Sequence, residues 1–349
     1  MAPHGQGLSH AERHGAICCD VLDAWFDPSP SAIEAFKSEG REMRTSPDTQ
    51  GLPLIDAIAE HRKLDSSCIS LGAGSSEIIH RVLPMLFGKG PAVILDPTYS
   101  EYGFVFSRDG IAIHRYRLKP EDDFKIDVTA LIEFCQAASI VVLVNPNNPT
   151  GQALSRSQIL RIRDELPQRT TLWVDEAYVD YCPAGTTVEH DASKIDGLYV
   201  LKSLSKAYAL SGIRAAYLTC TPKAANEIKR RTPPWIIGTS AQRAGCAALG
   251  DTAYYKRRWI ETADRLDAFA NALRDIGLIV HAGRINAVLI QSPLGSTGTD
   301  WAKSLRDHGL IVRTPEGMGE VLADNFIRIS LPPPALESTV LAIIFAAPV

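Results

Sequence analysis

The segment from Lys202 to Arg214 reads Lys-Ser-Leu-Ser-Lys-Ala-Tyr-Ala-Leu-Ser-Gly-Ile-Arg and places a lysine among small hydroxyl residues. The small neighbours leave the amine of Lys206 accessible. A cleft shared with Arg214 would lower the pKa of this amine, and a neutral amine can form an imine with an aldehyde. The hydroxyls of Ser203 and Ser205 and the Arg214 guanidinium can donate several hydrogen bonds to a phosphate monoester. Taken alone, the segment is also compatible with a surface lysine in a serine-rich loop.

Two further motifs each follow a short apolar run. In Val144-Asn-Pro-Asn-Asn-Pro-Thr-Gly151 the prolines and the glycine predict a rigid turn, from which the amide of Asn148 can donate to a phenolate oxygen of a bound ring. In Trp173-Val-Asp-Glu-Ala-Tyr178 the apolar run ends at Asp175, and a carboxylate in that position requires a partner. A protonated pyridine nitrogen is such a partner, and its charge makes the ring an electron sink.

Two additional stretches fit a phosphorylated ring. Gly72-Ala-Gly-Ser-Ser-Glu77 precedes an apolar helical stretch over residues 78–87. The backbone amides and hydroxyls of Ser75 and Ser76 would therefore form an anion site at a helix start. Asp96-Pro-Thr-Tyr99 places an aromatic ring after another apolar run, where Tyr99 could stack on a planar cofactor or pack in the core.

The elements that position these residues form a regular pattern. From about residue 91, short apolar runs alternate with stretches of helical period, which predicts a buried, mostly parallel sheet flanked by helices. In such sheets ligand groups gather at the carboxyl ends of the strands. The expected strands are 92–95, 111–116, 140–145, 171–175, 198–202 and 215–219.

Residues 252–277 predict one long helix, and an α+β tail follows it. The tail has expected strands at 278–281, 287–291, 310–313 and 326–330, and an expected helix near 300–308. The predicted fold class is α/β: a three-layer sandwich with a mostly parallel central sheet, plus a smaller α+β domain. We expect residues 1–40 to join this small domain, 41–250 to form the large cofactor-binding domain and 251–349 the C-terminal small domain, because neither terminal piece has enough apolar surface for its own core.

Composition excludes several classes of function. A formal net charge of -4 over 349 residues lacks the basic field that nucleic-acid binding requires. We find no run of about 20 apolar residues and no secretory signal, so we expect no membrane partner and a cytoplasmic location. The seven cysteines include no Cys-x-x-Cys pair, which argues against a disulfide framework and a zinc site, and we expect no metal.

Taken together and in this order, the five motifs resemble the fold-type I pyridoxal-phosphate enzymes of the class I and II aminotransferase superfamily, over nearly the whole chain. Within the superfamily, the chain most resembles the branch of histidinol-phosphate aminotransferase and threonine-phosphate decarboxylase. The short length, the Pro97-Thr-Tyr motif and the pair Ile311-Val-Arg313 and Phe326-Ile-Arg328 support this branch. The resemblance implies pyridoxal 5'-phosphate as the cofactor, held as a Schiff base on Lys206.

The resemblance also implies roles for single residues. Lys206 matches the lysine that binds the cofactor and moves the proton, and Asp175 matches the partner of the pyridine nitrogen. Asn148 and Tyr178 match the groups that bind the ring oxygen, and Tyr99 matches the stacking aromatic. The residues that match the phosphate-binding set are Ser75, Ser76, Ser203 and Arg214.

On the substrate side, Arg328 matches the arginine that binds a substrate carboxylate through two parallel hydrogen bonds. Related enzymes usually carry a tyrosine where this chain has Ser46, and that tyrosine reaches the cofactor phosphate of the neighbouring subunit. The asparagine-rich opening of the aminotransferases is replaced by Leu22-Asp-Ala-Trp-Phe-Asp-Pro28, in which Trp25 would line a more apolar substrate pocket or pack in the core.

Some features resemble the decarboxylase instead. His4-Gly5 and Pro233-Pro-Trp235 are similar to its motifs, and His4 would bind substrate or be a disordered terminal residue. The first hypothesis is a pyridoxal-phosphate-dependent aminotransferase acting on an amino acid or amino-phosphate type substrate. The alternative is an amino-acid decarboxylase of the threonine-phosphate type. A regulatory domain without turnover is disfavoured because the lysine is present, and the resemblance implies a homodimer with shared active sites.

Overall fold

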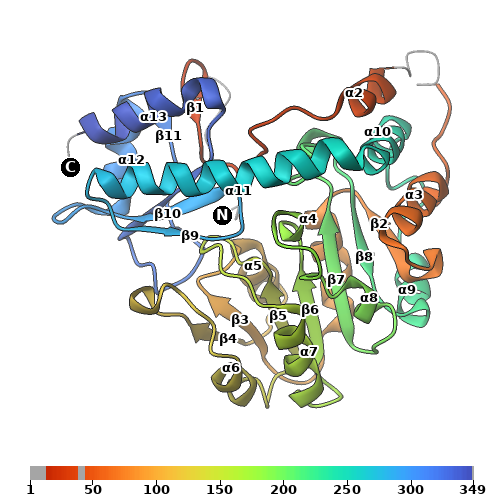
Figure 1. The fold of residues 1–349 in the computed structure, drawn as a ribbon. Helices are drawn as coiled ribbons and strands as arrows, with labels where there is room; N and C mark the ends of the chain where they lie inside the picture. The colour runs from red at the N-terminus through yellow and green to blue at the C-terminus, as the bar shows by residue number, and fades with distance from the viewer. Residues whose placement is uncertain (1–12, 38–43, 348–349) are drawn as a thin grey trace.

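The computed structural model describes residues 13–37 and 44–347, and within them the largest sheet has seven strands in the order β2-β8-β7-β6-β5-β3-β4 (Figure 1). The strands β4, β3, β5, β6 and β7 are parallel to one another, whereas β8 runs antiparallel to both β7 and β2. The bounds of these strands are β2 Ile69–Gly72, β3 Ala92–Asp96, β4 Ile113–Arg117, β5 Ile140–Val144, β6 Thr171–Asp175, β7 Leu198–Ser203 and β8 Ala216–Thr219.

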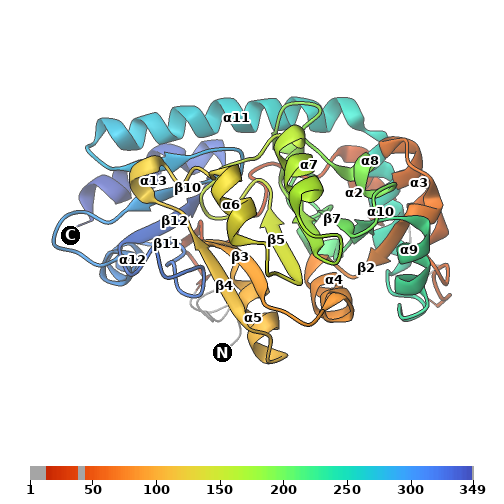
Figure 2. The same ribbon diagram turned by 90° about the horizontal axis from the view of Figure 1, so that it is seen from below.

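Helices cover both faces of this sheet, so its strands are apolar on both sides. In β5, Val141 and Leu143 pack in the cluster that contains the apolar residues of α6 and α7, which lie side by side in Figure 2. Ile140 and Val142 point the other way, into the cluster formed with α4, α5 and α9. The α/β class with three layers is confirmed. The helix bounds are α4 Ser75–Val82, α5 Ser100–Arg108, α6 Val128–Phe134, α7 Arg156–Glu165, α8 Glu189–Ala192 and α9 Pro222–Lys229.

Several predicted elements differ in their bounds from the structure, and the strands β1 (Ile17–Cys18) and β2 were not predicted. The helix expected over 78–87 ends as an α-helix at Val82, and a 3-10 turn over Leu83–Leu86 follows it, because Pro84 has no amide hydrogen to continue the α-helical bonding. The strand β4 begins two residues later than expected. The strand β2 was not predicted, since four residues containing a serine and a glycine carry little strand signal.

A smaller antiparallel sheet, β12-β10-β9, holds the C-terminal part together. Its strands are β9 Val280–Ala282, β10 Ala287–Gln291 and β12 Phe326–Ser330, packed with α12 Gly298–Asp307 and α13 Pro334–Ala346. The N-terminal strand β1 (Ile17–Cys18) pairs in parallel with β11 (Leu310–Ile311). In contrast, α2 (Pro30–Lys37) contacts α10 (Thr239–Gly250), next to α3 (Leu52–Arg62). The division of the chain at residues 40 and 250 stays a prediction.

The predicted long helix is α11, Thr252–Asp275, which crosses the top of Figure 1 from α10 to the small sheet. With 24 residues it is about 36 Å long at the usual helical rise. Its buried residues include Tyr255 at one end and Leu273 at the other. One rigid element therefore spans both parts of the molecule.

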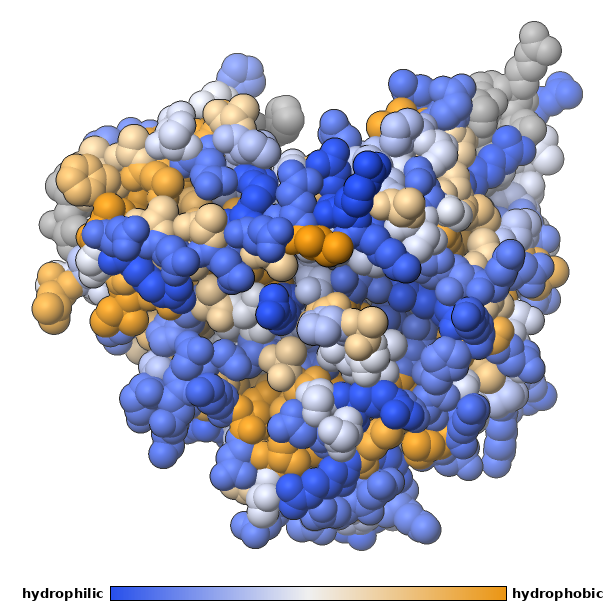
Figure 3. All heavy atoms as spheres, in the orientation of Figure 1, coloured by the Kyte–Doolittle hydropathy of each residue, from blue (hydrophilic) through white to orange (hydrophobic). Residues whose placement is uncertain are grey.

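The surface shown in Figure 3 is largely hydrophilic, with apolar residues gathered at the left over the C-terminal elements. Among the helices that the structure describes, none combines the length and the apolar character that crossing a membrane requires. Within the same residues, no group of three or more histidine, cysteine or acidic side chains is arranged to hold a metal ion.

Candidate active site

A cavity of about 210 Å³ opens at the carboxyl edge of the large sheet. Ten of the twelve residues that the sequence indicates for the site line this cavity, although they are spread over more than 250 positions of the chain. They are Ser75, Ser76, Tyr99, Asn148, Asp175, Tyr178, Ser203, Lys206, Arg214 and Arg328.

Strand direction explains why these residues meet. Asp175 is the last residue of β6 and Ser203 the last of β7, and these strands are parallel. Asn148 and Tyr99 lie in the connections that leave the parallel strands β5 and β3 at the same edge. Arg214 precedes β8, and because β8 is antiparallel to β7, its beginning lies beside the end of β7.

Asp175 is only 3% exposed and is held by two donors. The hydroxyl of Tyr102 donates to Oδ2 at 2.7 Å and the amide of Ala177 donates to Oδ1 at 3.0 Å. The indole of Trp173 donates in turn to the Tyr102 hydroxyl at 2.9 Å. Burial raises the pKa of Asp175 to about 6, although both donors oppose this shift. A protonated pyridine nitrogen would supply the positive charge that this buried carboxylate favours.

Lys206 points into the cavity and its amine is 3.0 Å from Oδ1 of Asp23. Burial lowers the pKa of this amine below its ordinary value; Asp23 opposes the shift, and Arg328 and Arg214 add to it. The lowered pKa favours the neutral amine that imine formation requires. Asp23 was not singled out from the sequence, although a carboxylate in the altered segment at residues 22–28 was a signal that could have identified it.

The start of α4 faces Arg214. Gly74 precedes the helix with φ +88°, and a side chain at this position would collide with the Arg214 guanidinium. Glycine therefore allows the arginine to lie against the helix start, where free backbone amides favour an anion. Ser75 and Ser76 lie here as predicted, and the Ser76 hydroxyl donates to the buried Glu101 at 3.0 Å. This end of the cavity has the donors that a phosphate requires.

Arg328 lies on β12 and is only 5% exposed, so its side chain does not lie on the solvent-exposed surface of the strand. Its Nη1 donates to Oδ1 of Asn148 at 2.8 Å and its Nη2 donates to the carbonyl of Asp20 at 2.6 Å, while its buried Nε has no hydrogen-bond partner among the described residues. Because the Asn148 oxygen accepts this bond, its amide nitrogen remains available as a donor. Burial lowers the pKa of Arg328 to about 10.

A second guanidinium lines the same cavity. Arg313 pairs with Arg328 through an isolated antiparallel bridge and is 6% exposed. Its Nη2 donates to the carbonyl of Glu316 at 3.0 Å, and burial lowers its pKa. The sequence placed Arg313 in a motif but assigned it no role, because nothing local indicates that the two arginines face one cavity.

The two tyrosines of the predicted site lie at its walls. Tyr178 is 6% exposed, and burial raises the pKa of its hydroxyl, which therefore stays protonated and able to donate. The ring of Tyr99 packs edge-on against Tyr102, with centroids 6.2 Å apart.

Of the remaining two predicted residues, the structure describes only Trp25, which does not line the cavity. Trp25 packs edge-on against Phe26, donates from its indole to Thr262 at 2.9 Å, and lies under the guanidinium of Arg265. These contacts favour packing, the second of the two expectations for Trp25. His4 lies outside the described residues.

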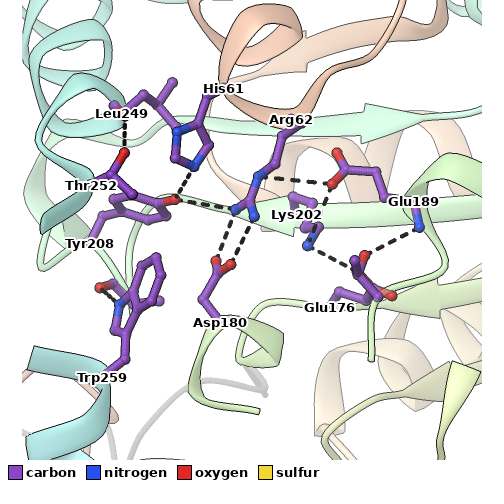
Figure 4. Close-up of polar contacts among 12 residues, drawn as sticks. His61, Arg62, Glu176, Asp180, Glu189, Lys202, Tyr208, Leu249, Thr252 and Trp259 are labelled. Carbon is purple, nitrogen blue, oxygen red and sulfur yellow. Dashed lines mark hydrogen bonds and ion pairs between the residues drawn. The ribbon is translucent and has the colours of Figure 1, made fainter. Parts of the chain in front are cut away.

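Charged side chains from α3, β7 and the segment after β6 meet in a largely buried cluster (Figure 4). Arg62 donates to both oxygens of Asp180, at 2.9 and 3.0 Å, and the amine of Lys202 lies 2.9 Å from Glu176. Next to Asp180, the hydroxyl of Tyr181 donates to the backbone carbonyl of Lys206 at 3.0 Å. Sequence reasoning missed this cluster, because its partners are far apart in the chain.

The sheet topology, with a buried carboxylate and a lysine at the carboxyl edge of the parallel strands, is that of a fold-type I pyridoxal-phosphate-dependent enzyme. The sequence profile of the family "Aminotransferase class I and II" matches residues 20–343, and the chain belongs to this family. It is a pyridoxal-phosphate-dependent aminotransferase.

Similar proteins support this assignment. The chain is 31% identical to a histidinol-phosphate aminotransferase of Rhodospirillum centenum, over 88% of this chain and 85% of the relative. It is 32% identical to that of Paramagnetospirillum magneticum, over 84% and 81%. The crystal structure of histidinol-phosphate aminotransferase from Sinorhizobium meliloti in complex with pyridoxal 5'-phosphate has a TM-score of 0.85 at 22% identity and covers 98% of this chain and 95% of its own. The L-threonine-O-3-phosphate decarboxylase from Porphyromonas gingivalis shares the fold, with a TM-score of 0.81 at 20% identity and coverage of 94% and 98%.

Proposed function

We propose that this aminotransferase takes the amino group from a substrate of the amino-phosphate type, in which a second, anionic group lies away from the reacting carbon. The observation that carries the proposal is the pair of buried guanidinium groups of Arg328 and Arg313 in one cavity. Burying two guanidinium groups side by side costs free energy unless anions lie between or beside them. The relatives named histidinol-phosphate aminotransferase support a phosphorylated amino substrate.

The roles of the chain's own residues follow from their positions. When bound, pyridoxal phosphate supplies an electron sink for the carbon that loses its proton. Asp175 would face the pyridine nitrogen, and Asn148 and Tyr178 would donate to the ring oxygen. The Nζ of Lys206 would hold and return the proton. The phosphate would be bound by Ser75, Ser76, Ser203 and Arg214.

We further propose a homodimer with shared active sites, located in the cytoplasm. Two exposed apolar side chains, Leu52 at 47% and Trp235 at 52%, support association, and the amide of Trp235 donates to Thr49 in the segment next to Ser46. Ser46 itself is exposed and does not line the cavity. The seven free cysteines support a reducing compartment.

The test compares histidinol phosphate with histidinol as amino donors and 2-oxoglutarate as the acceptor, with glutamate as the measured product. We expect the phosphorylated donor to be preferred. Arg313→Gln should raise its KM about tenfold or more, since a hydrogen bond to a charged group contributes roughly 1.5–3 kcal/mol. The control is Arg117→Gln, which changes an exposed arginine paired with Glu320.

Equal kcat/KM for the two donors, or an equal effect of Arg313→Gln on both, would contradict the amino-phosphate proposal. Release of carbon dioxide from threonine phosphate without any keto acid would instead indicate the decarboxylase.

A further inference from the structure

The carboxylate of Asp23 lies 3.0 Å from the Nζ of Lys206, although 183 positions separate them in the chain. We propose that Asp23 is a further catalytic residue, the counter-ion that stabilises the protonated state of the Lys206 nitrogen. No covalent bond to Asp23 forms or breaks, and Nζ does not transfer its proton to the carboxylate. The proposal does not depend on which amino substrate the enzyme takes.

The backbone around Asp23 is anchored from two sides. Asn286 is fully buried and directly precedes β10. Its side-chain amide donates to the backbone carbonyl of Asp23 at 2.9 Å and to that of Leu22 at 3.3 Å. On the other side, the indole of Trp25 donates to Thr262 of α11. These contacts hold the segment over the lysine, and they give Trp25 a positioning role.

The side chain of Asp23 is oriented by a second donor. The hydroxyl of Ser211 donates to the same oxygen, Oδ1, at 2.6 Å, and Ser211 belongs to the loop that carries Lys206. Although 57% of the Asp23 side chain is exposed, its carboxylate therefore accepts two bonds, one of them from a charged amine. Burial alone would raise the pKa of Asp23, but Lys206 and Ser211 lower it below its ordinary value.

The other charged groups around Lys206 act in the opposite direction. Arg214 and Arg328 both disfavour a second cation in the cavity, and burial does the same. Asp175 also lines the cavity, but its oxygens are bound to Tyr102 and to the amide of Ala177. Among the acidic side chains that the structure describes, Asp23 is the one paired with the Lys206 amine. The other titratable groups of the lining are Asp20, which is paired with Arg13, and Tyr99, Tyr178 and Arg313.

This arrangement suits a nitrogen that must change its protonation state during turnover. A neutral amine is required when Lys206 accepts a proton from the substrate carbon, and an ammonium results. Burial and the two arginines favour the neutral amine, and Asp23 favours the ammonium. The carboxylate thus keeps the two states close in free energy, as proton transfer in both directions requires.

The first test is a pH titration of the visible absorbance of bound pyridoxal phosphate, which reports protonation of the nitrogen that joins the cofactor to the protein. In Asp23→Asn the midpoint should fall by about one pH unit, because a neutral amide cannot stabilise the cation. Asp23→Glu keeps the charge and should stay closer to the parent protein. Asp27→Asn, with the same charge change at an exposed position of the same segment, should leave the midpoint unchanged.

A second readout uses the cofactor-free protein. Acetic anhydride reacts with the neutral amine, and mass spectrometry of the Lys206 peptide gives its rate against pH. In Asp23→Asn, labelling below the amine pKa should be up to about tenfold faster, since one pH unit changes the neutral fraction tenfold.

Superimposable labelling profiles for Asp23→Asn and the parent would overturn the proposal. So would equal absorbance shifts in Asp23→Asn and Asp27→Asn, which would indicate a general effect of net charge. Neither readout uses a substrate, so a wrong substrate assignment would leave both results intact.

Discussion

At the scale of the residue, the pKa of the Asp175 carboxyl group depends more on the groups that surround it in space than on its neighbours in sequence. Its oxygens accept from Tyr102 and from the amide of Ala177, and both bonds favour the ionised form, yet burial outweighs them and raises the pKa to about 6. A buried acid with a raised pKa stabilises a cationic ring nitrogen and at the same time destabilises the cofactor-free fold.

This leads to a prediction for stability against pH. Because the folded-state pKa of Asp175 lies above the ordinary value of 3.8, the native state binds the proton more tightly, and stability falls as pH rises from about 4 to about 6. Cofactor-free Asp175→Asn lacks this loss. We expect it to be more stable than the parent at pH 7.5 by at most about 3 kcal/mol, and equal near pH 4.

Urea unfolding of both proteins at the two pH values measures this difference. Transamination by Asp175→Asn should meanwhile fall roughly 100-fold or more, because the charge that we propose faces the ring nitrogen is lost. A variant that is equally destabilised at both pH values would contradict the assigned titration of Asp175.

At the scale of the element, the start of α4 lies against Arg214, which precedes β8, because Gly74 lets the guanidinium approach. We propose that the cofactor phosphate binds here. Gly74→Ala should weaken pyridoxal-phosphate binding about tenfold or more, measured by equilibrium dialysis, because the new methyl group displaces the guanidinium. Gly110→Ala is the matched control: Gly110 also has a positive φ, +71°, but its added carbon meets no atom within 4 Å. Equal affinity in the two variants would contradict the proposed role of this close approach.

The ion pair of Arg62 and Asp180 joins α3 to the 3-10 turn η4 (Val179–Tyr181) that follows β6. Burial alone would raise the pKa of Asp180, but Arg62 lowers it to about 2, so the pair is ionised. Asp180→Asn should cost about 3 kcal/mol in urea unfolding, since it leaves a buried guanidinium without its main partner.

The double variant Arg62→Met with Asp180→Leu provides the comparison. It removes both charges, and it should recover most of the lost stability. If the double variant is no better than Asp180→Asn, the loss comes from packing and the ion pair contributes little.

At the scale of the whole molecule, the pairing of β1 with β11 joins the two terminal segments to each other, and α11 runs from α10 to the small sheet. Arg328 reaches the cavity from β12 of the small sheet, and Asp175 and Lys206 reach it from the end of β6 and the loop after β7 of the large sheet. The cavity is complete only when both are in place.

The proposed homodimer belongs to this scale. Light scattering of the purified protein should give twice the mass of one chain, and the double variant Leu52→Asp with Trp235→Ser should shift it toward one chain, because charge and loss of apolar area oppose association. The control is the double variant Ile279→Asp with Phe345→Ser, which changes two other exposed apolar residues in the same way. A monomeric parent protein would refute the proposal.

Much of the site could be predicted from the sequence because local patterns determine it. Apolar runs of strand length, each followed by a turn signal, placed Asp175, Asn148 and Lys206 after parallel strands, and parallel strands bring such residues to one edge. The six predicted strands of the large sheet and the long helix α11 exist within a few residues of their expected bounds. The cofactor followed from the same motifs.

The tertiary structure alone decided which distant side chains meet. Asp23 faces Lys206, Arg313 faces Arg328, and Tyr102 holds Asp175, and no spacing in the chain relates the first two pairs. It also turned Trp25 away from the cavity and onto α11. A motif reports the local backbone, whereas hydrogen bonds, burial and the resulting pKa values depend on contacts through space, which only the packed molecule specifies.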